Sequence, residues 1–128
     1  MDVNVPMYLV GADAGAKARA RSAIERLLEA GEPLVTDAEV LQEILHRYGA
    51  IRRPDAIEPC TAALLEIVDT VLPIELEDVR RASSVVRASH LAARDALHLA
   101  VMQRHAIDRI LTFDRAFDGL PGVTRLPA

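Results

Sequence analysis

Hydrophobic residues along this chain alternate between short apolar runs and stripes with helical spacing. Residues 3–10 are apolar and partly β-branched, which predicts a first strand that Pro6 should keep short. Residues 14–30 carry apolar side chains on one helical face, and Gly31 supplies a stop. Further strands are predicted at residues 33–36, 71–74, 109–112 and 123–126. Further helices are predicted from a Thr36–Glu39 capping box to Tyr48, with Gly49 ending that helix, and at residues 55–69, 77–89 and 93–105.

Strands therefore alternate with helices along the whole chain, which is the pattern of an α/β protein with a parallel, doubly wound sheet. The chain has 128 residues, with no internal repeat and no low-complexity linker. That length supports one domain with one substantial core, so residues 1–128 are interpreted as a single domain.

The amino-acid composition argues against several classes of function. Aromatic residues make up 3% of the chain, so the base-stacking surfaces of single-strand binding proteins are not expected. The net charge of −4 does not indicate nucleic-acid binding, although the sum can conceal an acidic cleft that a metal neutralises. Cys60 is the only cysteine, which excludes a disulfide framework. Neither a signal peptide nor a membrane span is recognised, so we expect a cytoplasmic protein without membrane association.

Four carboxylates occupy related places in the predicted topology. Asp2 lies on the first strand, Glu43 on the helix after the second, Asp95 in the first turn of an apolar helix, and Asp114 just past a later strand. Because the carboxyl ends of parallel strands share one edge of a sheet, these side chains should converge. Like charges so close raise some of their pKa values unless a hard cation such as Mg²⁺ neutralises them. The pattern thus predicts metal-assisted phosphodiester hydrolysis by an activated water.

Each carboxylate also has a simpler interpretation when it is taken alone. The helix macrodipole favours Asp95 at a helix N-terminus without any ligand. Glu43 is spaced to pair with Arg47 on a solvent-facing surface, and Asp114 is suited to start a turn. His98 follows Asp95 by one helical turn and could reach the same site, although a helix histidine with its hydrogen bonds satisfied is the simpler interpretation. The four acidic positions carry weight only as an ordered set.

That ordered set resembles a known family. The segments that carry the resemblance are DVNV at the start, TDAEVLQEILHRYG, ARDALHLAVM, and ILTFDRAFD followed by PGV. Together they are similar to PIN domains and, more narrowly, to the VapC-type ribonuclease toxins of bacterial toxin–antitoxin pairs. The resemblance covers essentially the entire chain, and its specificity lies in the order and spacing of the segments.

The resemblance implies a three-layer α/β/α sandwich with a central, parallel, five-stranded sheet, and Mg²⁺- or Mn²⁺-dependent endonucleolytic cleavage of RNA. It implies that Asp2, Glu43, Asp95 and Asp114 are the catalytic residues. Asp2 and Asp95 would be the principal metal ligands with Asp114 assisting, while Glu43 would orient or deprotonate the attacking water. The implied partners are an RNA substrate, a cognate VapB-like antitoxin and a second copy of the chain in a homodimer.

Two departures from the family pattern are visible. Only Met1 precedes Asp2, and Val3 stands where a hydroxyl residue is common. Either the first strand is short, or the natural start lies a few codons upstream; disorder of Asp2 at the terminus is the simpler alternative. Ala92 also stands where a serine often caps the helix before Asp95, and losing such a cap costs about 1 kcal/mol.

Other functions fit less well. A haloacid-dehalogenase phosphatase needs a second acidic residue where Asn4 stands and a late lysine, whereas Lys17 is the only lysine; a receiver domain lacks the same lysine. The remaining alternative is a degenerate PIN domain that serves as an interaction or RNA-binding module. Arg52, Arg53 and Arg94 are candidates for contacts to RNA, with a solvated surface as the simpler interpretation.

Overall fold

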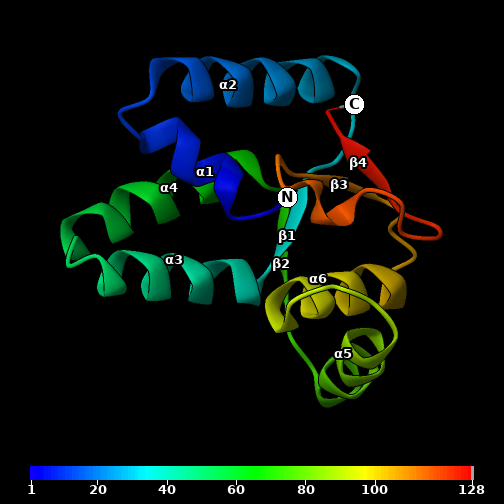
Figure 1. Ribbon diagram of the computed structural model, residues 1–128. Coiled ribbons are helices and arrows are strands. Elements are labelled where there is room, and N and C mark those ends of the chain that lie inside the picture. Colours follow the sequence, from blue (N-terminus) through cyan, green and yellow to red (C-terminus); the bar gives the residue numbers. More distant parts are fainter. Residues whose placement is uncertain (128) are drawn as a thin grey trace.

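The computed structural model describes residues 1–127, in which short parallel strands lie among helices. Figure 1 shows α1 and α2 on one side of the strands and α5 and α6 on the other. The helices are α1 (Asn4–Val10), α2 (Ala14–Glu29), α3 (Ala38–Ala50), α4 (Ile57–Ile67), α5 (Leu76–Ala88) and α6 (Ala93–Arg104), with 3₁₀ turns η1 (Pro54–Ala56) and η2 (Arg115–Phe117). The strands are β1 (Val35–Asp37), β2 (Thr70–Leu72), β3 (Arg109–Leu111) and β4 (Thr124–Leu126).

The strands form two parallel pairs. In the first pair, β1 runs beside β2 with Val35 opposite Thr70, and in the second β3 runs beside β4 with Arg109 opposite Thr124. The prediction of a parallel α/β fold is confirmed, but the described residues form two two-stranded sheets and not one five-stranded sheet.

Met1 and Asp2 connect the two pairs. The amino group of Met1 donates to the Val35 carbonyl of β1 at 2.8 Å, and the Asp2 N–H donates to the Leu111 carbonyl of β3 at 3.0 Å. A cavity of about 290 Å³ lies between β1 and β3, and its lining includes Met1, Val35, Leu111 and Met102. One backbone hydrogen bond from each of these two residues thus links the two strand pairs.

The prediction of a strand at residues 3–10 is wrong, because these residues form helix α1. Pro6 lies in the first turn of that helix, where a missing N–H breaks no intrahelical bond. The Val5 N–H already bonds back to the Asp2 carbonyl at 3.3 Å, so the chain turns into the helix directly after Asp2. A short apolar run does not distinguish a strand from a buried helix by periodicity.

The other predicted elements are present within a few residues of their expected bounds. Gly31 has φ +71° after α2, which is the left-handed conformation expected of a helix stop. The predicted helix at residues 55–69 divides into η1 and α4, and Gly49 lies inside α3 without ending it. Asp37, and not Thr36, caps α3 by accepting from the Val40 N–H. The Thr36 hydroxyl donates to the Met1 carbonyl and so ties the N-terminus to β1.

Helix α6 is the most buried helical segment near the strands, with Ala96, Ala100 and Val101 almost inaccessible. It packs against α5, and its last turn is held by Arg104, whose guanidinium donates two hydrogen bonds to the buried Asp78 carboxylate. This packing fixes the N-terminal turn of α6, which carries Asp95, beside the strand ends. No helix in residues 1–127 combines the length and apolarity needed to cross a membrane.

Candidate active site

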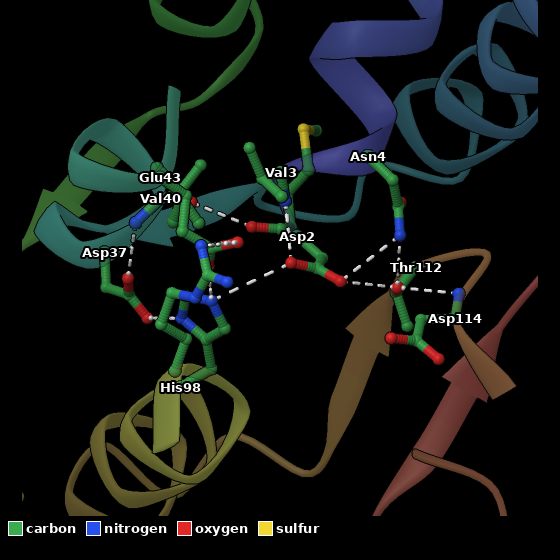
Figure 2. A network of polar contacts seen from close by, with 12 residues as sticks. Asp2, Val3, Asn4, Asp37, Val40, Glu43, His98, Thr112 and Asp114 are labelled. Atoms are coloured by element: carbon green, nitrogen blue, oxygen red, sulfur yellow. Dashed lines mark hydrogen bonds and ion pairs between the residues drawn. The ribbon is translucent and has the colours of Figure 1, made fainter. Parts of the chain in front are cut away.

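Asp2 lies at the centre of the candidate site, and its side chain is held by three donors (Figure 2). Its carboxylate accepts from the Val3 N–H at 2.7 Å, from the Thr112 hydroxyl at 2.7 Å and from the Asn4 amide at 3.3 Å. The Asn4 amide also donates to the Thr112 hydroxyl oxygen, which joins the N-terminus to the end of β3. Asp2 is therefore an ordered, buried carboxylate despite its place at the start of the chain.

Helix α3 brings two carboxylates to the same place. Asp37 ends β1 and caps α3, and Glu43 lies on the second turn with its side chain only 3% exposed. The interpretation of Glu43 as a solvent-facing residue is therefore wrong. Arg47 does lie near its carboxylate, at 3.7 Å, but from the more exposed side of the helix.

His98 of α6 lies between these two carboxylates. Its Nδ1 is 2.7 Å from Asp37 Oδ2, its Nε2 is 2.7 Å from Glu43 Oε1, and Nε2 is also 3.7 Å from Asp2 Oδ1. Burial alone would lower the pKa of His98, but the hydrogen bonds to Asp37 and Glu43 raise it to about 10. Both ring nitrogens thus have a hydrogen-bond partner, as expected of a satisfied histidine, and the ring also lies beside Asp2 of the site.

Asp95 lies one turn before His98 and is only partly buried. Burial raises the pKa of its carboxyl to about 6, and the nearby charge of Asp2 adds to this, while His98 acts in the opposite direction. Among residues 1–127 the Asp95 side chain has neither a hydrogen-bond partner nor an ion-pair partner. One oxygen of Asp95, one of Asp2 and one ring nitrogen of His98 all lie within 4.8 Å of one another. Asp95 is thus the uncompensated charge of the cluster.

Asp114 lies at the rim. It is exposed and caps η2 by accepting from the Ala116 N–H at 2.9 Å, while its own N–H donates to the Thr112 hydroxyl oxygen at 3.0 Å. The turn interpretation of Asp114 therefore describes its local role. Its charge nevertheless contributes to the raised pKa of Asp95, which places it near the cluster.

Arg94, like Arg47, borders the cluster near Glu43. Arg94 Nη1 lies 3.9 Å from Glu43 Oε2 and is buried as an atom without a hydrogen-bond partner. Its side chain as a whole is 41% exposed, so the guanidinium spans from the site to the surface. Of the three arginines considered for RNA contacts, Arg94 lies at the site. Arg53 instead forms a surface pair with Asp55.

The four carboxylates predicted from the sequence thus lie around one cluster, with Asp114 at its edge. Sequence reasoning missed Asp37 and Thr112, and it considered His98 but favoured a structural role for it. Asp37 and Thr112 each had a signal, since each is a polar residue at the carboxyl end of a strand. Thr112, directly after β3, donates its hydroxyl to the Asp2 carboxylate.

Comparison with known proteins identifies the family. A model of the PIN domain family matches residues 1–123. A VapC ribonuclease of Mycobacterium bovis and ribonuclease VapC13 of Mycobacterium tuberculosis are each 54% identical over 127 residues, which cover 98% of this chain and 97% of theirs. The chain belongs to the PIN-domain family and, within it, to the VapC ribonucleases. Ribonuclease VapC23 of Mycobacterium tuberculosis is a more distant relative, 39% identical over 115 residues.

Solved structures agree on the PIN fold. A toxin–antitoxin complex from Klebsiella pneumoniae aligns with a TM-score of 0.65 at 21% identity, over 96% of this chain and 92% of the other. The Mycobacterium tuberculosis VapC20 toxin, described as cleaving the sarcin–ricin loop, aligns with a TM-score of 0.64 at 21% identity, over 89% and 88% of the two chains. At this identity the likeness supports the VapC fold alone.

Proposed function

We propose that this protein is a divalent-metal-dependent endoribonuclease and the toxin of a VapBC-type pair, acting on RNA in the cytoplasm. The observation that carries the proposal is the unpartnered Asp95 carboxyl beside Asp2, at the edge of a cluster that holds three further carboxylates. Family membership makes RNA the substrate class to test, because the relatives at 54% identity are named ribonucleases.

The donor set around Asp95 fits a hard divalent cation. Asp2 and Asp95 offer carboxylate oxygens within one small volume, and Asp114 lies close enough to affect Asp95 electrostatically. Mg²⁺ and Mn²⁺ accept such oxygen donors together with water and substrate phosphate. We assign Asp2 and Asp95 as the principal ligands and Asp114 as an assisting one. When bound, the metal supplies an activated water and neutralises charge that develops on the phosphate.

The protein's own groups prepare this site in advance. Thr112, Asn4 and the Val3 N–H fix the Asp2 carboxylate, so little side-chain freedom is lost when it becomes a ligand. Glu43 is buried with Oε1 bonded to His98, which leaves Oε2 to orient the attacking water. Arg94 reaches from this carboxylate to the surface and is placed to contact an RNA phosphate.

The alternative of a catalytically weak interaction module loses its main argument in this geometry. The absence of a hydroxyl after Asp2 is the sign of degeneracy, yet the Asp2 carboxylate still accepts a hydrogen bond from a hydroxyl, that of Thr112, at 2.7 Å. All four acidic positions are filled and lie around one cluster. The arrangement therefore favours the enzyme.

We further propose a VapB-like antitoxin and a second copy of this chain as partners. Family membership and the toxin–antitoxin complex among the structural neighbours support an antitoxin. Exposed apolar side chains also support a protein interface, since large ones seldom lie on a surface in groups without a partner. They are Leu45, Ile51 and Leu65 on and near α3 and α4, and Leu76, Val79 and Val86 on α5.

The test is cleavage of a fluorescent single-stranded RNA by the purified chain, free of antitoxin, in Mg²⁺ or Mn²⁺. We expect cleavage that stops in excess EDTA and that falls by at least about 100-fold in the Asp95→Asn variant. Asp108→Asn is the matched control, because Asp108 is an exposed aspartate just before β3. Cleavage that persists in EDTA, or that survives the Asp95→Asn change, would contradict the proposed mechanism.

A further inference from the structure

Three residues form a buried unit beside the proposed metal ligands, and we call Asp37, His98 and Glu43 the His98 bridge (Figure 2). Asp37 and Glu43 lie on either side of the first turn of α3, and His98 reaches them from α6. Both bonds are 2.7 Å long, and the three side chains are 3–8% exposed. The bridge therefore joins two helices at the point where each contributes to the site.

We propose that His98 is a positioning residue for the cleavage reaction: through the His98 bridge it fixes the Glu43 carboxylate relative to Asp95. This inference rests on the proposed function. Asp37 is itself immobile, because its Oδ1 accepts from the Val40 N–H of α3 while Oδ2 faces His98. Glu43, with three rotatable torsions, has His98 as its hydrogen-bond partner at Oε1.

The geometry also separates His98 from the metal. An imidazole binds a metal through a ring nitrogen, and each ring nitrogen of His98 lies 2.7 Å from a carboxylate oxygen, so both nitrogens already face a hydrogen-bond partner. A histidine with one nitrogen on a carboxylate and the other on a metal is nevertheless a common arrangement. Asp2, Asp95 and His98 lie close enough for it, so that assignment is the competing outcome.

Two amide substitutions divide the bridge into its halves. An asparagine at this position places its amide N–H near the site of Nδ1, so His98→Asn keeps the bond to Asp37 and loses Glu43. A glutamine reaches to the site of Nε2, so His98→Gln keeps Glu43 and loses Asp37. Each variant loses one buried bond, so their losses of stability should be similar. His46→Asn is the control, since His46 is an exposed histidine on α3.

Kinetics on single-stranded RNA then distinguish positioning from general support of the fold. We expect His98→Asn to lower kcat by about 10–100-fold with little change in KM, and His98→Gln to retain most of kcat. Equal losses of kcat in the two variants, or a larger loss in His98→Gln, would overturn the proposal. Asp37→Asn keeps the helix cap and should lower kcat less than His98→Asn. If His98→Asn fails to fold, a kcat in His98→Gln that lies more than about 10-fold below that of the wild type overturns the proposal instead.

Mn²⁺ binding, followed by electron paramagnetic resonance without RNA, provides the readout besides activity. Positioning predicts that both His98 variants bind Mn²⁺ at least as tightly as the wild type, because His98 contributes no ligand atom. A loss of Mn²⁺ affinity by about 10-fold or more in both variants would make His98 a ligand and refute the proposal. Failure of the proposed function has a different signature, since the wild type itself would then leave RNA intact.

Discussion

Asp95 should destabilise the metal-free protein, so Asp95→Asn is expected to raise its stability while it removes activity. The pKa of the Asp95 carboxyl is raised from 3.8 to about 6. At about 1.36 kcal/mol per pKa unit, this shift corresponds to at most about 3 kcal/mol. Because solvent screens a partly buried carboxyl, we reduce this to about 1–2 kcal/mol. The variant also loses a helix-dipole interaction of about 0.5 kcal/mol, which leaves a net gain of about 1 kcal/mol.

The pH dependence follows from the direction of the shift. The folded state holds the Asp95 proton more tightly than the unfolded state, so the stabilising effect of protonation is fully present below pH 3.8. It is lost as the pH rises through about 6, and the wild type carries the whole penalty at higher pH. The difference between variant and wild type should therefore grow between about pH 4 and pH 6 and then stay level.

Thermal unfolding in EDTA across this pH range measures the effect. For a chain of 128 residues, 1 kcal/mol corresponds to about 4 °C in Tm, so we expect a rise of about 4 °C at pH 7.5. Added Mg²⁺ should raise the Tm of the wild type and have little effect on the variant, because binding to the folded state stabilises it. Asp108→Asn should change neither quantity. A variant that is less stable than the wild type at pH 7.5 in EDTA, or a difference independent of pH, would refute this reasoning.

Three other predictions concern the surroundings of the site. Arg94→Gln should weaken RNA binding and reduce the slope of log K against log salt concentration by about one. The control is Arg21→Gln, at an exposed arginine on α2, which should change neither, and an unchanged slope in Arg94→Gln would exclude a phosphate contact. Arg104→Met should destabilise the protein by about 3 kcal/mol in urea unfolding, because it leaves the buried Asp78 carboxylate unpaired, and a loss below about 1 kcal/mol would contradict this. A short apolar extension before Met1 should fill the cavity between β1 and β3 and raise the Tm, and an unchanged Tm would show that an extended segment does not enter it.

The fold could be predicted from the sequence where local pattern and tertiary environment agree. The stripe of α2 and the apolar α6 are long enough for periodicity to identify them. Residues 3–10 were misassigned because β-branched apolar residues suit both a strand and a buried helix. Pro6 was the available signal, since a proline two residues into an element is typical of a first helical turn.

The site was predictable to the extent that topology alone determines it. Parallel strands align their carboxyl ends, so Asp2 and Asp114 could be expected near one another without knowledge of any side-chain contact. The pairing of His98 with Asp37 and Glu43 spans 61 and 55 residues and depends on how α6 is rotated against α3. Packing decides that rotation. A histidine that lies between two acids therefore has the same sequence pattern as one that faces solvent.

The distribution of charge around the site explains why one region is suited to a cation. Protein groups already compensate Asp37 and Glu43, through His98 and, more weakly for Glu43, through Arg47 and Arg94. Three hydrogen-bond donors hold Asp2, but they bring it no full positive charge at hydrogen-bond distance. Asp95 has neither form of compensation among the described residues, and its raised pKa expresses that deficit. His98 compensates the charge of Glu43, whereas no described residue compensates that of Asp95. The negative charge that remains for a cation to neutralise therefore lies between Asp2 and Asp95.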